Sequence, residues 1–432
     1  MQTSSPSNLG VVIGQPYPPP DSLKEIVFIR HAESQANVDG VWNGKSDGPL
    51  SEEGETSLEV LGRRLSRWNF NAVISSPLSR AKLTAEAFSN DVRVDESFIE
   101  IDLGKWEGLH FTEVQEKHGD QLQAAFADRT LPMGETGESL EQATQRALEA
   151  VDDLLDEMAP DSRVAVVTHG GFMQSVLGRH LPGSTQRPHA FTSNTALTRV
   201  VWQYGRTRLA AFNDTGHFGP RPRAISEHLE KGEPVLALIR HGRTRANVER
   251  RWQGRGDWDL DDVGVAQADA LGRWYGKHGT VYNSPLKRAA STAHRVALNG
   301  STPLDGLMEL HMGEWEGLTT DEIFERWPED VERIYRHGID LPRGGTGESW
   351  ADLRLRVTET VAGLQVDETA PTLVVAHGGA IRSYISGLTA STDTHAQSLH
   401  TPTNTSVTHV AITATGPLIL DYGVAAHLEE TG

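Results

Sequence analysis

The stretch that decides the fold is Glu25-Ile-Val-Phe-Ile-Arg-His31, because it occurs a second time as Val235-Leu-Ala-Leu-Ile-Arg-His241. Each copy is a short apolar run that ends in an Arg-His pair, which is typical of a buried strand reaching the edge of a sheet. The two histidines are 210 residues apart (241 − 31 = 210). Solenoid repeats have periods of roughly 20–50 residues, so this spacing indicates a duplicated domain.

Four further motifs recur in the same order at nearly the same spacing. They are Ser76-Pro-Leu-Ser-Arg80 with Ser284-Pro-Leu-Lys-Arg288, Gly104-Lys-Trp-Glu-Gly108 with Gly313-Glu-Trp-Glu-Gly317, Thr136-Gly-Glu-Ser139 with Thr346-Gly-Glu-Ser349, and Val166-Val-Thr-His-Gly-Gly171 with Val374-Val-Ala-His-Gly-Gly379. Between the copies, Gly and Pro at 219–223 interrupt the apolar pattern. The sequence therefore predicts a flexible leader over 1–21, a first domain over 22–218, a linker over 219–233 and a second domain over 234–432.

Short apolar runs alternate with helical patterns in each half. In the first half, strands are predicted at 26–29, 73–74 and 164–167, and helices at 58–68, 80–88 and 140–158, the last with Ser139 as its N-cap. This alternation predicts an α/β fold with two tandem domains, each a mostly parallel sheet with helices on both faces. Such sheets bind ligands at the carboxyl ends of their strands, where the Arg-His pairs and His169 are expected to lie.

Composition narrows the function. The chain has 432 residues, a formal net charge of −19 and no cysteine. The acidic surface makes nucleic acid and anionic membranes poor partners, and the lack of cysteine excludes disulfides and thiol nucleophiles. The sequence has neither a long apolar span nor the basic and apolar regions of a secretory signal, so we expect a cytoplasmic protein.

The residue types around each Arg-His pair suit phosphoryl transfer to a histidine. The attacking ring nitrogen must be neutral, and neighbouring guanidinium groups favour the neutral ring and bind the phosphoryl oxygens. Fixed cations of this kind can stabilise the transition state in place of Mg²⁺. The predicted nucleophiles are His31 and His241. The residues predicted to bind the phosphoryl group beside them are Arg30, Arg80 and His169 in the first half and Arg240, Arg288 and His377 in the second.

Further groups are assigned to phosphate binding and to proton transfer. Glu100 and Glu309 stand between apolar neighbours, where burial can raise the pKa of a carboxyl group, so they are predicted to protonate the leaving oxygen and then to activate water. Glu107 and Glu316 are the alternative carboxyls. No His or acidic residues recur at metal-ligand spacing, so no metal is predicted. The additional predicted phosphate contacts are Asn37, Asn43, Gly170, Asn247, Gln253 and Gly378.

Taken together, these motifs resemble the histidine phosphatase superfamily, in its phosphoglycerate mutase-like branch. The resemblance covers nearly all of both halves and rests on five motifs found twice in the same order. It implies a phosphohistidine intermediate at His31 and His241, Glu100 and Glu309 as acid and base, and no metal or other cofactor. It also implies a small phosphorylated metabolite as the substrate; the oligomeric state is left open.

Three departures from the family pattern separate the halves. Ala32 replaces the usual Gly after the nucleophile and could crowd the backbone there, and Asn43 is shorter than the common Gln, which Gln253 retains. Arg243 stands where the family usually has Glu or Gln. The first site is therefore predicted to be the more diverged one.

Three functions stay open at this point. The first is a phosphatase, the second a phosphoglycerate mutase-type transferase, and the third a catalytic domain joined to a non-catalytic binding or structural domain. Glu100 runs directly into the Gly104 motif without the insertion usual in mutases, which favours the phosphatase. Substrate specificity is assigned to segments 111–133 and 318–343, which are predicted to be loops.

Overall fold

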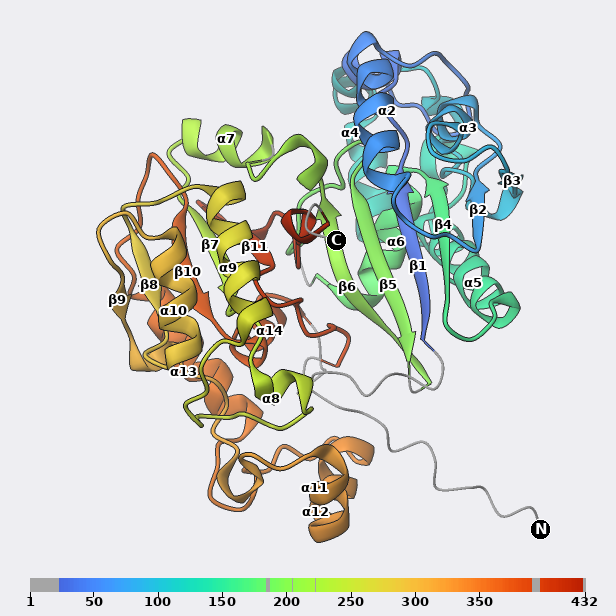
Figure 1. Cartoon of the computed structure of the whole chain (residues 1–432). Helices are drawn as coiled ribbons and strands as arrows, with labels where there is room; N and C mark the ends of the chain where they lie inside the picture. The colour runs from blue at the N-terminus through green and yellow to red at the C-terminus, as the bar shows by residue number, and fades with distance from the viewer. Residues whose placement is uncertain (1–22, 184–186, 204, 222, 391–396, 430–432) are drawn as a thin grey trace, which may run out of the picture. The chain divides into compact units, whose positions relative to one another are not determined.

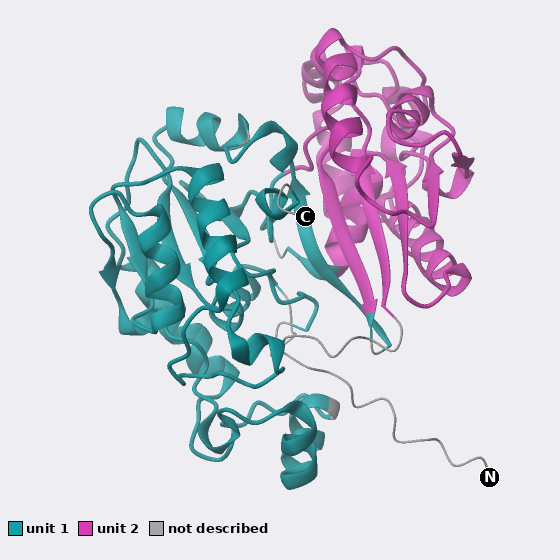
Figure 2. Cartoon of the chain, in the orientation of Figure 1, with its two compact units in different colours: residues 1–20, 180–190, 203–432 teal, residues 21–179, 191–202 magenta. Residues whose placement is uncertain are grey.

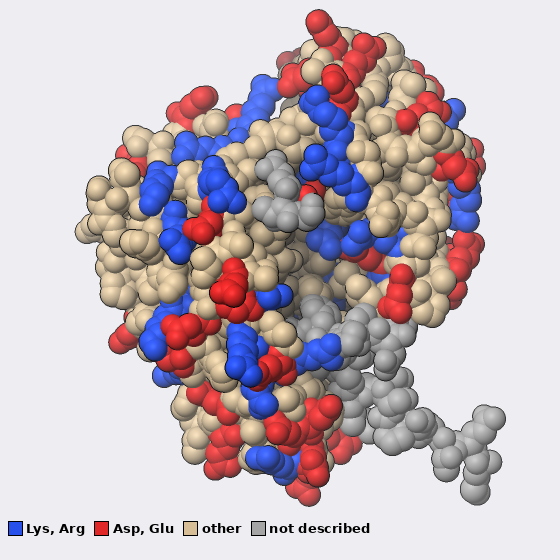
Figure 3. All heavy atoms as spheres, in the orientation of Figure 1, with Lys and Arg blue, Asp and Glu red and all other residues tan. Residues whose placement is uncertain are grey.

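The computed structural model describes residues 23–183, 187–203, 205–221, 223–390 and 397–429; the predicted leader over 1–21 lies outside these ranges. Each half builds a six-stranded mixed sheet with flanking helices (Figure 1). The predicted fold class, two tandem α/β domains with mostly parallel sheets, is confirmed. No helix in the described ranges combines the length and apolar character needed to cross a membrane. On the face drawn in Figure 3, acidic and basic side chains are interspersed.

The first sheet has the strand order β3-β2-β4-β1-β5-β6. Strand β1 runs parallel to β4 and antiparallel to β5, and Arg30 is in register with Thr168. This register brings His31 and His169, the next residues along each strand, to the same edge of the sheet. The strands are β1 Lys24–Arg30, β2 Ala72–Ser75, β3 Arg93–Val94, β4 Ser162–Thr168, β5 Leu197–Gln203 and β6 Arg206–Asp214.

The second sheet has the order β12-β11-β7-β10-β8-β9, which is the same arrangement listed from its other end. Strand β7 is parallel to β10, with Arg240 in register with Ala376, so His241 and His377 also emerge together. The strands are β7 Val235–Arg240, β8 Val281–Asn283, β9 Thr302–Pro303, β10 Thr372–Ala376, β11 Val407–Thr413 and β12 Gly416–Ile419.

Helices cover both faces of the first sheet. Leu61 of α2 and Ala81 of α3 pack with Val27 and the side chains that share its face. On the opposite face, Phe28 contacts Phe172 of α6, with ring centroids 6.2 Å apart. The helices of this half are α1 Gln35–Val38, α2 Glu52–Leu65, α3 Ser79–Glu86, α4 Phe111–Ala127, α5 Leu140–Glu157 and α6 Gly170–His180, with 3₁₀ turns at Glu96–Phe98, Gly104–Trp106, Met133–Glu135 and Gly216–Phe218.

The N-terminal caps explain where these helices begin. The predicted helix at 58–68 starts earlier, at Glu52, because the side chain of Ser51 accepts the N–H of Gly54. The predicted N-cap Ser139 is confirmed and forms a capping box with Gln142. After the first half, the helices are α7 Arg223–Glu230, α8 Arg245–Val248, α9 Asp262–Tyr275, α10 Lys287–Val296, α11 Thr320–Arg326, α12 Pro328–Val331, α13 Trp350–Ala362 and α14 Gly378–Gly387, with a π-helical turn η7 at Glu332–Arg336 and 3₁₀ turns at Asp305–Leu307, Gly313–Trp315 and Ala426–Leu428.

The prediction that 111–133 and 318–343 are loops is wrong. The first segment is mostly the helix α4, and the second contains α11, α12 and η7. In α4, Val114, Leu122 and Ala125 are buried at helical spacing and pack around Trp106. In the second segment, Thr319 starts α11 with a capping box. These helical elements replace the predicted loops.

By spatial packing, the chain divides into two compact units (Figure 2). One contains residues 21–179 and 191–202. The other contains the second half from 203 onward together with residues 180–190. Strand β6 and the segment 180–190 thus belong to the first repeat in sequence but pack with the second half. The boundary predicted at 219–233 is a boundary between repeats and stays a prediction from the sequence.

Candidate active sites

The two predicted nucleophiles occupy equivalent buried positions directly after β1 and β7. His31 is 4% exposed and His241 is 3% exposed. Each ring places Nδ1 against the carbonyl oxygen of the next residue, 2.6 Å from Ala32 O and 2.7 Å from Gly242 O. A carbonyl oxygen only accepts hydrogen bonds, so Nδ1 carries the proton. The lone pair of Nε2 is therefore available for attack in both sites.

The surroundings keep both nucleophiles neutral. Burial, followed by the charges of Arg30 and Arg80, holds the pKa of His31 well below its usual 6.5. Burial, followed by Arg288 and Arg240, does the same to the pKa of His241. A neutral imidazole is the form that can attack phosphorus, so the electrostatics favour the reactive state.

The arginines at the strand ends are anchored by backbone carbonyls. Arg30 donates Nη1 to Thr192 O at 2.5 Å, and Arg240 donates Nη1 to Pro402 O at 2.6 Å. The Nε atom of each is buried with no hydrogen-bond partner in the described part of the chain. Burial lowers the pKa of Arg240 to about 10, so the guanidinium stays charged at neutral pH.

Arg80 of α3 and Arg288 of α10 are anchored by backbone carbonyls in the same way. Arg80 donates to Ser46 O at 2.8 Å and to Gly44 O at 2.7 Å. Arg288 donates to the carbonyls of residues 256 and 254 at 2.7 and 2.8 Å. Their Nε atoms are likewise buried and unpartnered among the described residues. These hydrogen bonds fix the neighbouring loop and leave Nε as the guanidinium nitrogen that is open to a ligand.

A second histidine completes each site. The rings of His31 and His169 have centroids 5.1 Å apart, and those of His241 and His377 are 5.2 Å apart. In both second histidines Nε2 lies 2.7 Å from a serine hydroxyl, that of Ser76 or Ser284. Their Nδ1 atoms are buried without a partner in the described residues. When the serine donates to Nε2, Nδ1 carries a proton that it can donate to a phosphoryl oxygen.

The predicted acids lie against the first turn of α6 and α14. Glu100 accepts the N–H groups of Gly171 and Phe172 at 2.9 and 3.0 Å. Glu309 accepts those of Gly379 and Ala380 at 2.9 and 3.1 Å. These hydrogen bonds fix each carboxylate in place.

This contact explains the second glycine of each His-Gly-Gly motif. A Cβ at Gly379 would lie 2.3 Å from Glu309 Oε1, and one at Gly171 would lie 2.6 Å from Glu100 Oε1. Only glycine lets the helix backbone approach the carboxylate this closely.

The alternative carboxyls have a structural position. Glu107 accepts hydrogen bonds from Gly44 N, Lys45 N and the hydroxyl of Ser46. Glu316 accepts Arg255 N at 2.9 Å in the corresponding loop. Both loops are the ones that Arg80 and Arg288 hold from the other side. The geometry therefore assigns Glu107 and Glu316 to the loops that shape the sites.

The predicted amide contacts differ between the halves. Asn37 Oδ1 accepts Ser34 N in the capping box of α1, and Asn247 Oδ1 accepts the backbone and hydroxyl of Thr244 in that of α8. Gln253 Oε1 accepts the hydroxyl of Thr244 at 3.1 Å. The backbone carbonyl of Asn43 lies 3.5 Å from Arg80 Nη2.

The first glycines of the His-Gly-Gly motifs lie beside the strand-end arginines. A Cβ at Gly170 would stand 3.5 Å from Arg30 Nε, and one at Gly378 would stand 3.4 Å from Arg240 Nε. Both glycines thus leave the space next to an unpartnered guanidinium nitrogen open. Among the described residues that line the second site, Gly379 is present and Gly378 is not.

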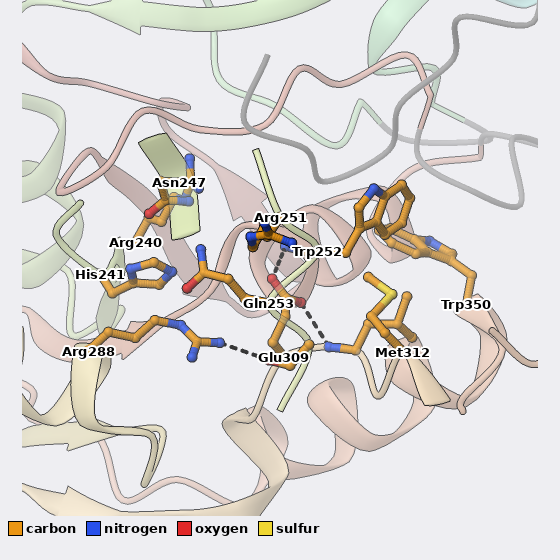
Figure 4. Close-up of a pocket in the computed structure, with 13 residues that line it drawn as sticks. Arg240, His241, Asn247, Arg251, Trp252, Gln253, Arg288, Glu309, Met312 and Trp350 are labelled. Atoms are coloured by element: carbon orange, nitrogen blue, oxygen red, sulfur yellow. Dashed lines mark hydrogen bonds between the residues drawn. The ribbon is translucent and has the colours of Figure 1, made fainter. Parts of the chain in front are cut away.

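The second site opens into a pocket with two chemically different ends (Figure 4). His241, Arg240 and Arg288 lie at one end, and Trp252, Met312 and Trp350 lie at the other. Glu309 and Gln253 lie between them. The remaining lining residues are Asn247, Arg251, Gly254, Leu310 and Gly379. Such a pocket can hold an anion at the histidine and an organic group against the apolar side chains.

Sequence reasoning missed an asparagine in each site. Asn194 donates Nδ2 to His31 O at 2.9 Å, and Asn404 donates Nδ2 to His241 O at 2.8 Å. They lie in Ser193-Asn-Thr195 and Thr403-Asn-Thr405, a further motif at the 210-residue spacing (404 − 194 = 210). The same repeat analysis would have found it.

The substitution of Ala32 is accommodated. Ala32 is fully buried, and its N–H donates to Thr84 Oγ1 at 2.9 Å, the distance that Gly242 N makes with Thr292 Oγ1. The additional methyl group of Ala32 therefore leaves this backbone hydrogen bond intact. Across the described residues, no group of three or more His, Asp or Glu side chains is placed to hold a metal ion.

Comparison with known proteins gives one family for both halves. The profile of the histidine phosphatase superfamily (branch 1) matches residues 26–215 and 236–425. The metal-independent phosphoserine phosphatase of Arabidopsis thaliana is 34% identical over 165 residues, which are 36% of this chain and 68% of that protein. Phosphoserine phosphatase 1 of Hydrogenobacter thermophilus is 30% identical over 205 residues, 46% of this chain and 95% of that protein.

Among solved structures, a mutant phosphoserine phosphatase from Entamoeba histolytica in complex with phosphoserine is similar to this chain. It is 24% identical, with a TM-score of 0.40, and the match covers 45% of this chain and 98% of that one.

Proposed function

Because the chain belongs to branch 1 of the histidine phosphatase superfamily, with one copy of the domain in each half, we propose that it hydrolyses small phosphomonoesters through a phosphohistidine at His31 and at His241. The observation that carries the proposal is a set of three buried nitrogens beside each nucleophile that have no acceptor in the described part of the chain. They are Arg30 Nε, Arg80 Nε and His169 Nδ1 in the first half, and Arg240 Nε, Arg288 Nε and His377 Nδ1 in the second.

Leaving buried donors without acceptors is costly, at about 1–3 kcal/mol each. A fold that keeps three of them beside one buried histidine, and does so twice, is suited to an anionic ligand that supplies the acceptors. A phosphoryl group has three peripheral oxygens, and the transition state of its transfer spreads charge over them. Fixed donors aimed at those oxygens stabilise the transition state.

The proposed reaction proceeds in two steps. His31 or His241 attacks phosphorus with the Nε2 lone pair, a P–N bond forms and the ester P–O bond breaks. Glu100 or Glu309 gives its proton to the leaving oxygen and becomes a carboxylate. The same carboxylate then takes a proton from water, whose oxygen attacks phosphorus and breaks the P–N bond. Inorganic phosphate leaves, and histidine and glutamic acid are restored.

The apolar end of the second pocket supports a substrate with an organic leaving group. Phosphoserine, which relatives of this chain hydrolyse by name, is a natural first substrate to test beside simple aryl phosphates. A mutase would return the phosphoryl group to an acceptor hydroxyl and release no phosphate, so phosphate release distinguishes the two activities.

The test uses His31→Ala, His241→Ala and the double variant with an aryl phosphate, with phosphate release as the readout. Each single variant is expected to retain the activity of the other site, and the double variant is expected to lose all of it. Full activity in the double variant would contradict the phosphohistidine. Unchanged activity of His31→Ala on every substrate tried would make the first site non-catalytic.

A further inference from the structure

A short segment of the first half pairs with an edge strand of the second. Ala190 donates its N–H to Ile419 O at 2.8 Å, and Ile419 donates to Pro188 O at 2.9 Å. Ile419 is the last residue of β12 and is fully buried. The side chain of Ala190 packs into a small apolar cluster of the second half that includes Val235. Residues 188–190 are therefore fixed by the second half.

The reverse contact also exists. Leu209, in the middle of β6, donates its N–H to Ser398 O at 2.8 Å and accepts the N–H of His400 at 2.9 Å. Both bridges run parallel, His189 with Ile419 and Leu209 with Leu399. Residues 398–400 of the second half are therefore fixed by a strand of the first.

The repeat spacing shows that these are two copies of one contact. Leu209 and Ile419 are 210 residues apart (419 − 209 = 210) and so are equivalent in the duplication. Between them, Phe212 and Tyr422, equivalent to each other by the same spacing, exchange backbone hydrogen bonds of 2.9 and 3.0 Å. An element that pairs with its own repeat is the mark of an isologous, two-fold contact, here formed within one chain.

In the first half, the exchanged segment leads into the active site. Residues 188–190 are followed by Thr192, whose carbonyl accepts Arg30 Nη1, and by Asn194, whose amide donates to His31 O. The same loop also contributes Thr195 N, which donates to Arg30 O at 3.0 Å. The arginine and the nucleophile are thus both held by the loop of residues 192–195.

The second site repeats this arrangement. Residues 398–400 are followed by Pro402, whose carbonyl accepts Arg240 Nη1, and by Asn404, whose amide donates to His241 O. From the edge-strand hydrogen bond at His400 to Asn404 the chain advances only four residues. So short a connection transmits the position of the strand to the arginine and the histidine.

We propose that β6, a strand of the first repeat, positions the second active site by holding residues 398–400 through Leu209. This inference rests on the proposed function. Leu209 acts as a positioning residue through its backbone groups and touches no reacting atom. The second site therefore depends on a strand that the first repeat supplies.

The test replaces Leu209 with proline, which removes the N–H that bonds to Ser398 O. The change is measured in the His31→Ala background, which reports the second site, and in the His241→Ala background, which reports the first. Leu209→Ala is the matched control, because it shortens the side chain and keeps the N–H. Ile419→Pro is a second control, because it places proline at the equivalent position of β12, whose N–H bonds to Pro188 O instead.

Leu209→Pro is expected to lower kcat of the second site by on the order of ten- to a hundredfold, since small displacements of catalytic groups have effects of this size, and to spare the first. Leu209→Ala and Ile419→Pro are expected to keep kcat of the second site near wild type. Loss confined to the first site, or equal loss from Leu209→Pro and Leu209→Ala, would overturn the proposal.

A second measurement covers the case in which the proline variants do not fold, and it needs no hydrolysis. In Arg80→Ala, inorganic phosphate is expected to bind at the second site alone. Coupling is reciprocal, so this binding should slow hydrogen exchange at Leu209 and His400 and leave Ala190 and Ile419 unchanged. In Arg288→Ala, where phosphate is expected to bind at the first site alone, exchange at Leu209 and His400 should stay unchanged. Unchanged exchange at Leu209 and His400 in Arg80→Ala under saturating phosphate would contradict the proposal, whereas absence of phosphate binding would contradict the proposed function instead.

Discussion

The two candidate active sites share the groups proposed to react and differ at their rims. The hydrogen bond from the nucleophile's Nδ1 to the next carbonyl is 2.6 Å in one site and 2.7 Å in the other, and the second histidine lies 2.7 Å from its serine in both. The carboxylate accepts the N–H of Gly171 or Gly379 at 2.9 Å in each case. Duplication has thus preserved the groups that would handle phosphate.

The rims have diverged in charge. Val41 and Arg251 occupy equivalent positions, since each forms the bridge to the residue before the next helix. Beside Val41, Phe111 packs edge-on against Trp42 at 5.5 Å, whereas at the equivalent place Trp252 donates Nε1 to Thr320. At this position the first half therefore has an apolar side chain and the second a guanidinium. The comparison teaches that the halves differ more in the side chains around the candidate sites than in the groups proposed to react.

The largest expected effect tests the shared chemistry. Arg80→Ala should lower kcat of the first site, and Arg288→Ala that of the second, by about 10²–10³, the range for removing a donor that stabilises a developing charge. Lysine at either position should not restore activity. Its single ammonium nitrogen cannot bond to two loop carbonyls and also leave a further nitrogen for the phosphoryl group, as the guanidinium does. Rates are compared in the two single-nucleophile backgrounds. A loss below tenfold at one site only would break the equivalence of the two sites.

A smaller effect concerns stability and pH. The pKa of His31 and that of His241 are held well below 6.5 in the folded chain by burial and by the arginines. Below about pH 6.5 the unfolded chain binds a proton that the folded chain does not, so stability is lost as the pH falls, by about 1.4 kcal/mol per pH unit for each group. His31→Gln and His241→Gln should each flatten this slope by that amount.

The measurement is urea unfolding at about pH 7, 6 and 5, a range that spans the usual pKa of histidine. A change with His241→Gln alone would show that the two nucleophiles have different environments, against the geometry.

Much of the fold was predictable because the motifs that mark its strands and helices occur twice in the sequence. Strand ends marked by Arg-His and His-Gly-Gly fixed which residues meet at the sheet edge, since neighbouring parallel strands end at the same side. The helix α4 was missed because its buried positions face the small cluster around Trp106 instead of a sheet, and its sequence is rich in charged and polar residues. Local composition predicted a loop where tertiary packing makes a helix.

The sites were predictable in their residues but not in their connections. The sequence does not show that the Nη atoms of Arg80 and Arg288 donate to backbone carbonyls of a loop, because any residue type can supply a backbone carbonyl. Asn194 and Asn404 could have been found from the repeat. The pairing of 188–190 with Ile419 could not, since it joins irregular backbone to a strand more than 200 residues away (419 − 190 = 229).

The smallest expected effect tests the difference between the rims. Arg251 lines the second pocket, is about one-third exposed and is held by Glu249 Oε2 at 2.9 Å and by Gly317 O at 2.8 Å. Arg251 is partly neutralised by Glu249 and is partly exposed to solvent. Its attraction for a second anionic group of a substrate is therefore limited to about 1 kcal/mol, or roughly fivefold in kcat/KM. Arg251→Val should therefore lower kcat/KM about fivefold for a phosphate ester that carries a carboxylate and leave a neutral aryl phosphate unaffected.

The reciprocal change, Val41→Arg, should move the first site in the opposite direction by a smaller factor. The first half has Asp39 where the second has Glu249, and Asp39 is one methylene shorter, so it is less suited to orient a new arginine. For each site, the ratio of kcat/KM for the acidic ester to kcat/KM for the neutral ester should become similar in the variant and the wild type at high salt. Exposed charges are screened over about 10 Å at 0.1 M ionic strength. If the two sites still differ in selectivity at high salt, the difference would come from their apolar residues, such as Trp350 in the second half where the first has Leu140, and not from the charge at the rim.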